Sequence, residues 1–196
     1  MFLKIETIKS LIAVFAVGLP LVSNVCAQSF WLDQNPLPNW NEKSRAILQT
    51  KKISNDELKR CSSVVRQPTL PADLLLAKMG WTLVGAAHVH GKTTVVTVAE
   101  GFDGMCRPLK SQALVFVRDR VSGTLSPSPM DSRADGSLVN VKMATETNLT
   151  AEYARYRESD PLCCPYKTEA VTFTVKPDGA NFLLTPDAAK ISNEGK

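Results

Sequence analysis

Two histidines stand one residue apart, at His88 and His90, and the chain contains no others. Alternate side chains of a β-strand point to the same face, so both imidazoles would lie together and could bind one metal ion. A catalytic zinc needs at least a third protein ligand, and only Glu100 and Asp103 are near in the sequence. If Gly91-Lys92 forms the turn that follows, both histidines lie beside an exposed hairpin tip. We therefore expect two surface histidines, with no metal and no other cofactor.

Other catalytic patterns are weak. Five carboxylates could supply an acid and base pair, but a chain of this size offers such pairs by chance: Glu100, Asp103, Glu152, Glu158 and Asp160. The sequence has no Gly-x-Ser-x-Gly nucleophile elbow and no glycine-rich phosphate loop between a strand and a helix. We assign no catalytic residue and expect a protein that is not an enzyme. The alternative is a small periplasmic hydrolase or metal-dependent enzyme that uses His88 and His90.

The amino-terminal residues 1–27 have the features of a cleavable signal peptide. Lys4 and Lys9 precede an apolar run from Leu11 to Val22, and Val25-Cys26-Ala27 fits the rule for signal peptidase. The run is shorter than the roughly 20 residues that cross a bilayer. The mature protein is then expected to begin at Gln28, in the periplasm or outside the cell, without a transmembrane segment. In the alternative, Cys26 carries a lipid anchor, although that processing favours a small residue where Val25 stands.

The four remaining cysteines predict disulfides, because an even number in an exported chain is typical of a disulfide framework. Three pairings are possible for Cys61, Cys106, Cys163 and Cys164. A bridge between the neighbours Cys163 and Cys164 would tie no distant segments together. We favour the other two pairings, in which each of these neighbours bonds to Cys61 or Cys106, and leave the choice between them open. The cysteines lack the C-x-x-C spacing of a zinc site.

Charge excludes one class of partner. The formal net charge is +4, and the basic residues alternate with acidic ones, as in Glu42-Lys43-Ser44-Arg45 and Asp56-Glu57-Leu58-Lys59-Arg60. Such mixed runs are typical of solvated faces and not of the basic stripe that binds phosphates. We expect no nucleic acid partner and an unidentified component of the envelope instead.

Local patterns predict helices first and strands afterwards. Residues 28–53 carry Trp31 and Trp40 on either side of Pro36 and Pro38, which predicts an extended arm that packs its aromatic rings onto the body. Ser54 and Glu57 have the spacing of a capping box, so a short helix carrying Cys61 should follow. A second helix is predicted from Pro71 to Met79, ended by Gly80.

After Gly80 the pattern changes to β. Strands are predicted over 81–90, 93–100, 113–117, 138–143, 151–157, 171–175 and 182–184, and a loop over 121–136. Helices followed by antiparallel strands predict an α+β fold, with one or two short helices packed on a curved sheet of about five to six strands and disulfide bonds. We place this single domain at residues 54–187 and a flexible tail at 188–196.

The carboxyl-terminal half resembles a known family. Ala113-Leu114-Val115-Phe116-Val117, Tyr153-Ala154-Arg155-Tyr156, Asp160-Pro161-Leu162-Cys163-Cys164-Pro165 and Val171-Thr172-Phe173 together are similar to the LppP/LprE lipoproteins of bacterial envelopes. The Asp-Pro-x-Cys-Cys-Pro element is the distinctive part. The resemblance covers roughly Trp81 to Leu184 and implies an envelope location. It carries over no catalytic residue, because the family has no established activity.

Overall fold

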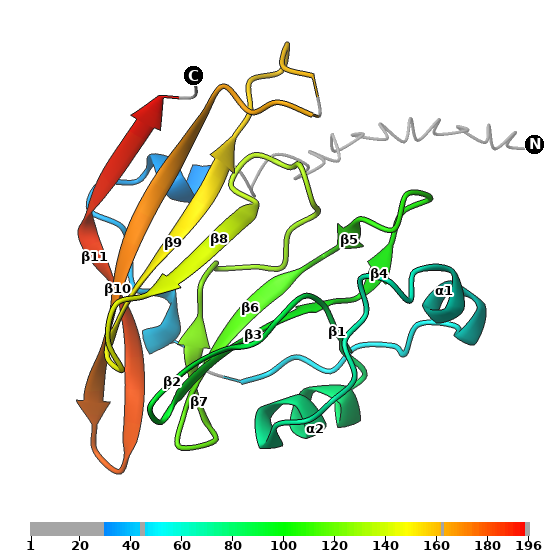
Figure 1. Ribbon diagram of the computed structural model, residues 1–196. Coiled ribbons are helices and arrows are strands. Elements are labelled where there is room, and N and C mark those ends of the chain that lie inside the picture. Colours follow the sequence, from blue (N-terminus) through cyan, green and yellow to red (C-terminus); the bar gives the residue numbers. More distant parts are fainter. Residues whose placement is uncertain (1–29, 44–45, 162, 195–196) are drawn as a thin grey trace, which may run out of the picture.

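The computed structural model describes residues 30–43, 46–161 and 163–194, and most of this chain lies in antiparallel strands (Figure 1). The predicted signal peptide and Cys26 lie outside the described residues. The α+β class predicted from the sequence is confirmed. The strands, however, divide between two main sheets instead of forming one curved sheet.

The first sheet has the order β1-β3-β6-β7, and β2 also pairs with β3. Its strands are β1 (Thr82–Leu83), β2 (His88–His90), β3 (Thr93–Ala99), β6 (Gln112–Val117) and β7 (Arg120–Thr124). The apolar run in β6 is central and buried between β3 and β7, as its composition predicts. The loop predicted from Val121 is wrong at its start, because residues 121–124 form β7, which pairs with β6.

The second sheet has the order β11-β10-β9-β8. Its strands are β8 (Leu138–Met143), β9 (Asn148–Arg155), β10 (Lys167–Asp178) and β11 (Asn181–Glu194). The strand predicted over 151–157 is present as far as Arg155 and begins earlier, at Asn148. The tail predicted at 188–196 is wrong as far as Glu194, because the long strand β10 offers β11 a partner along its length and Lys167 pairs with Glu194.

Both predicted helices are present, as α1 (Asn55–Arg60) and α2 (Pro71–Lys78), the latter followed by Gly80 at φ 95°. The Ser54 hydroxyl accepts the amide of Glu57 at 3.2 Å, which is one half of the predicted capping box. The other half is replaced, because the Glu57 carboxylate accepts the amide of Phe102 at 2.8 Å. This bond holds α1 against the small sheet of β4 (Gly101–Phe102) and β5 (Pro108–Leu109).

Each face of the first sheet is buried against a different partner. One face packs against α2 through Leu76, Trp81, Val96 and Phe116. The opposite face packs against the second sheet in the main core, where Val95 and Val115 lie in one cluster with Tyr153 and Phe173. Successive side chains of β3 point to opposite faces of the sheet, so they contribute to two different cores, one on each side.

The tryptophan arm belongs to the main core. Trp31 is buried, and its ring meets that of Tyr153 edge to face with centroids 4.9 Å apart. Trp40 is half-buried and donates to the carbonyl of Thr124 at 3.1 Å. Two short 3₁₀ helices, Phe30–Asp33 and Trp40–Glu42, interrupt the extended course that the prolines predicted.

Candidate functional site

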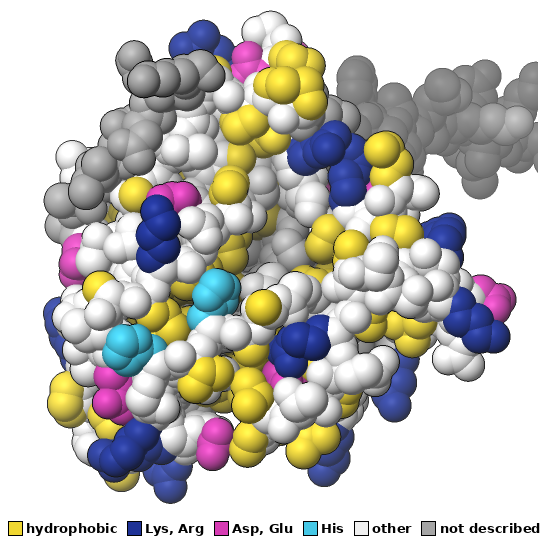
Figure 2. Space-filling model, viewed as in Figure 1, with side chains coloured by type: hydrophobic (Ala, Val, Ile, Leu, Met, Phe, Trp, Pro, Cys, Tyr) yellow, Lys and Arg dark blue, Asp and Glu magenta, His cyan; other side chains and the backbone are white. Residues whose placement is uncertain are grey.

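The two sheets meet along one side and diverge along the other (Figure 1). On the first side β7 lies against β11. On the other side the edge strand β8 faces the hairpin of β2 and β3, and the surface between the sheets is hollowed (Figure 2). The hairpin tip closes one end of this hollow, because the amide of Lys92 donates to the carboxylate of Glu146 at 2.9 Å.

Three adjoining cavities form the hollow, which we call the inter-sheet groove. The central cavity has a volume of about 110 Å³. A first-sheet cavity of about 480 Å³ shares Thr97 and Pro108 with it. A second-sheet cavity of about 380 Å³ shares Ser132 and Leu138 with it. Because the linings overlap, the three cavities adjoin one another.

The central cavity is lined by apolar side chains and by polar groups that are largely bonded within the protein. The Tyr153 hydroxyl is wholly buried and donates to the carbonyl of Leu125. Burial raises the pKa of Tyr153 well above its ordinary value, so the phenol stays neutral. The side-chain amide of Gln112 donates to the backbone carbonyl of Ser126 at 3.2 Å. The Ser126 hydroxyl donates to the backbone carbonyl of Ser128 at 2.8 Å. These groups shape the cavity and are not arranged as a nucleophile with its base.

Basic side chains outnumber acidic ones on the lining of the groove. Two arginines and one histidine line the three cavities, and their linings include no carboxylate: Arg107, Arg133 and His88. Arg107 is paired with Asp103, whose pKa is lowered chiefly by the Arg107 amide, so this pair is close to neutral. Arg133 is half-buried and has no hydrogen bond or ion pair within the described part of the chain. An unbalanced guanidinium at this end favours an anionic ligand.

The histidines lie where the sequence predicts. The hairpin register pairs His88 with Val95 and His90 with Thr93, and both histidines are exposed. His88 lines the first-sheet cavity, whereas His90 lines none of the three cavities. Within residues 30–43, 46–161 and 163–194, no three ligands of the kind that bind metals come together.

The candidate carboxylates are dispersed. Glu100 pairs with Lys110 at 3.4 Å and Asp103 with Arg107. Glu152 pairs with Lys142 at 3.0 Å on the outer face of the second sheet, and Asp160 accepts the amide of its neighbour Arg157. Glu158 is exposed. The structure therefore does not bring the five carboxylates together as an acid and base pair.

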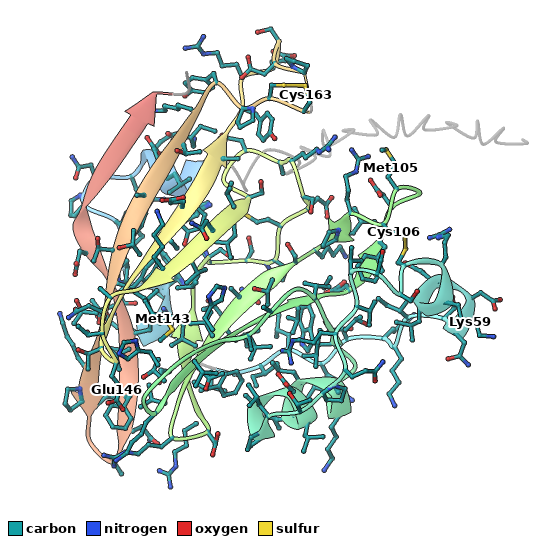
Figure 3. All side chains as sticks on the ribbon, viewed as in Figure 1. Lys59, Met105, Cys106, Met143, Glu146 and Cys163 are labelled. Carbon is teal, nitrogen blue, oxygen red and sulfur yellow. A yellow bond between two sulfur atoms is a disulfide. The ribbon has the colours of Figure 1, made fainter. Side chains whose placement is uncertain are left out.

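The predicted disulfide pairing is wrong. Cys61 bonds to Cys106, with Cα atoms 5.2 Å apart, and Cys163 bonds to Cys164. The cause is the bond between Glu57 and Phe102, which brings the end of α1 to the turn that carries Cys106. Cys163 and Cys164 lie in the loop between β9 and β10, and Figure 3 shows Cys106 and Cys163 well apart.

Sequence reasoning missed the groove residues Arg107, Arg133, Ser132 and Ser137. Three of them lie in the long connection between β7 and β8, where the sequence has no periodicity. The length of this connection was the available signal, since long loops without secondary structure are often functional.

Comparison with known proteins confirms the resemblance. The family model described as LppP/LprE lipoprotein matches residues 90–178. The match runs from the end of β2 to the end of β10 and includes most residues that line the central and second-sheet cavities. No curated protein and no solved structure matches the chain. In the described residues, no helix is long and apolar enough to span a membrane. Residues 90–178 thus match the LppP/LprE lipoprotein family model, and this match points to an exported protein that is associated with the cell envelope.

Proposed function

We propose that this protein is a non-catalytic binding module of the envelope whose ligand lies in the inter-sheet groove. The observation that carries the proposal is the row of three adjoining cavities, whose linings have basic side chains and no carboxylate. A concave surface with a few placed polar groups is the usual form of a binding site. The family match supports the location in the envelope.

A binding role fits the chemistry of the lining better than catalysis does. The hydroxyls of Tyr153 and Ser126 already donate to backbone carbonyls, and His88 lines the groove without His90. A hydrolase would need a nucleophile or an activated water with a base beside it. We infer that the mature protein begins at Gln28 in the periplasm or outside the cell, and the mass of the mature protein tests this start against lipidation of Cys26.

Site-specific photo-crosslinking in the cells that export the protein tests the groove. Ala86 is exposed on the first-sheet cavity and Val139, 57% exposed, lies on the second-sheet cavity. A photoreactive phenylalanine at either position should give the same adduct, and mass spectrometry of the digested adduct identifies the ligand. The matched control is Gln67, which is exposed and lines none of the three cavities.

Two further arms make this test decisive. Ser132→Trp fills the junction between two cavities and should abolish the adduct at both groove positions. An adduct that forms only at Gln67, or that survives Ser132→Trp, contradicts the proposal. Metal analysis, with activity measured on His88→Ala and His90→Ala, tests the enzyme alternative, and a stoichiometric metal lost in the double variant would establish it.

A further inference from the structure

We propose that the ligand of the inter-sheet groove is an extended peptide segment that adds to the edge of β8 and places a carboxylate at Arg133. This inference rests on the proposed function and names the class of ligand. Three independent observations support it, namely the free strand edges, the size of the central cavity and the sign of the charge.

The edges of two strands face the groove without a partner strand. β8 is the last strand of its sheet and pairs with β9 alone, and β2 pairs with β3 alone. No backbone hydrogen bond between β2 and β8 is present among the described residues. An unpaired edge presents a row of amides and carbonyls, to which an extended peptide adds as a further strand.

The side chains of β8 leave this edge accessible. Asn140 and Lys142 both bond to Glu152, at 3.3 and 3.0 Å. Because the neighbours Ala151 and Tyr153 are buried between the sheets, Glu152 and its two partners lie on the opposite, outer face. Val139, at the register shift in β8, lines the second-sheet cavity. An incoming peptide would therefore meet main chain and Val139, without a charged side chain between.

The central cavity has room for one small side chain. Its volume of about 110 Å³ is below the ~150 Å³ of a cavity that holds a single benzene ring. Thr97, Ser111 and Gln112 contribute polar groups to the lining. A peptide in extended conformation directs alternate side chains to one face, so one small residue would enter the central cavity while the residues two positions before and after it face the two outer cavities.

Arg133 supplies the charge that selects the ligand. Arg133 lines the second-sheet cavity together with Ser132 and Ser137. The carboxylate of Asp103 pairs with Arg107 and not with Arg133. The planar guanidinium binds a carboxylate through two parallel hydrogen bonds. The carboxylate could belong to an acidic side chain or to the carboxyl terminus of the peptide, and the experiment distinguishes these sources.

The experiment uses two matched libraries of random octapeptides, one with free carboxyl termini and one with amidated termini. The protein recovered from the envelope is incubated with each library, and bound peptides are identified by mass spectrometry. We expect peptides from both libraries if side chains supply the carboxylate, and from the first library alone if the terminus does. For the selected peptides, Ser132→Trp and Arg133→Gln should each weaken the dissociation constant roughly tenfold or more, whereas Gln67→Trp should not change it.

Further arms separate this inference from the proposed function. Methylation of alternate peptide amides should abolish binding, because strand addition uses main-chain donors. The inference is overturned if binding survives that methylation or Ser132→Trp, or if neither library yields a peptide. If oleate binds instead and Ser132→Trp prevents it, the ligand is an amphiphile and the proposed function stands. If the groove positions also give no photo-crosslink, both proposals fail.

Discussion

The side-chain amide of Asn41 donates to the carbonyl of Leu184 at 3.1 Å and so joins the amino-terminal arm to β11. The same side chain donates to the carbonyl of Thr124 in β7 at 3.2 Å and accepts its amide at 2.8 Å. β7 and β11 are neighbours that belong to different sheets. Asn41, which is 1% exposed, therefore supplies buried hydrogen bonds that join the two sheets on their closed side.

Asn41→Ala should lower the free energy of unfolding by about 2–4 kcal/mol, because buried groups of Thr124 and Leu184 lose their partner. Asn41→Asp should be no better, since a carboxylate cannot donate. Urea unfolding at pH 7 measures both changes. The exposed Asn55→Ala is the control and should cost under about 0.5 kcal/mol. Equal stability of Asn41→Ala and this control would contradict a joining role for Asn41.

Local features of the fold could be predicted from the sequence. The hairpin of β2 and β3 has the predicted register because its turn, at Gly91, is formed by adjacent residues. Ser54 and Pro71 mark the helix starts for the same reason. The division into two sheets could not be predicted, because strand periodicity does not say which distant strands meet, and the contact that joins them passes through Asn41.

The groove depends on contacts that are not local. His88 could be placed on an exposed hairpin because its position follows from the turn. Arg133 could not, since its place depends on how the connection between β7 and β8 crosses the groove. The cysteine pairing failed for a similar reason, because Glu57 bonds to a distant amide, that of Phe102, instead of completing its own capping box.

Asp73 makes the free energy of unfolding depend on pH in the acid range. Its side chain is fully buried and accepts hydrogen bonds from both terminal guanidinium nitrogens of Arg66 and from the amides of Thr69 and Leu70. Burial raises the pKa of Asp73, but these hydrogen bonds outweigh it and lower the pKa to about 2. Because the folded pKa is depressed, this stabilisation is present above the unfolded pKa and is lost as the pH falls from about 4 to about 2.

We expect Asp73→Asn to lower the free energy of unfolding by about 2 kcal/mol at pH 7. The difference from the wild type should shrink as the pH falls from 4 to 2, because the wild type loses the charge that the variant never had. Urea unfolding at pH 7, 4 and 2.5 checks this. Asp119→Asn, at an exposed position, should have the same free energy of unfolding as the wild type at each of the three pH values. A deficit for Asp73→Asn that does not depend on pH would show that the carboxylate charge is not the cause.

Arg155 balances three carboxylates at a buried position. It is 8% exposed and bonds to Asp33 at 2.7 Å, Asp135 at 2.9 Å and Glu169 at 2.5 Å. Burial alone would lower the pKa of Arg155, but the bonds to the carboxylates raise it, so the guanidinium stays charged. Arg155→Met removes the guanidinium from the largely buried Asp135 and leaves Glu169 with Lys167 as its only cation among the described residues, so it should cost about 3–5 kcal/mol in chemical unfolding at pH 7.

Asp33→Asn is the matched control for this network. Asp33 is 52% exposed, so its loss should cost under about 1 kcal/mol. The deficit of Arg155→Met should also shrink in acid. Burial raises the pKa of Glu169, but the bonds to Lys167 and Arg155 outweigh it and lower the pKa, and protonation of Glu169 removes the charge that Arg155 stabilises. If Asp33→Asn costs as much as Arg155→Met, the arm and not the buried pair with Glu169 is the main source of stability.

The two disulfides should contribute very different amounts to the free energy of unfolding. The bridge between Cys61 and Cys106 spans a sequence separation of 45, and closing such a loop is worth up to about 4 kcal/mol in the chain-entropy model. The bridge between Cys163 and Cys164 spans a separation of 1 and constrains almost nothing in the unfolded chain. Replacing the first pair by alanine should therefore cost about 2–4 kcal/mol, and replacing the second pair close to nothing.

Thermal and urea unfolding of the two double-alanine variants measure this difference, and non-reducing peptide mapping of the envelope protein identifies the bridges. Cys61 is buried, so the single variant Cys106→Ala, at a position that is only partly buried, separates loss of the bridge from loss of core packing. It should show most of the effect of the double variant. A peptide that links Cys61 to Cys163 or Cys164 would contradict the pairing, and an equal loss of stability in both double variants would show that loop length does not set the contribution.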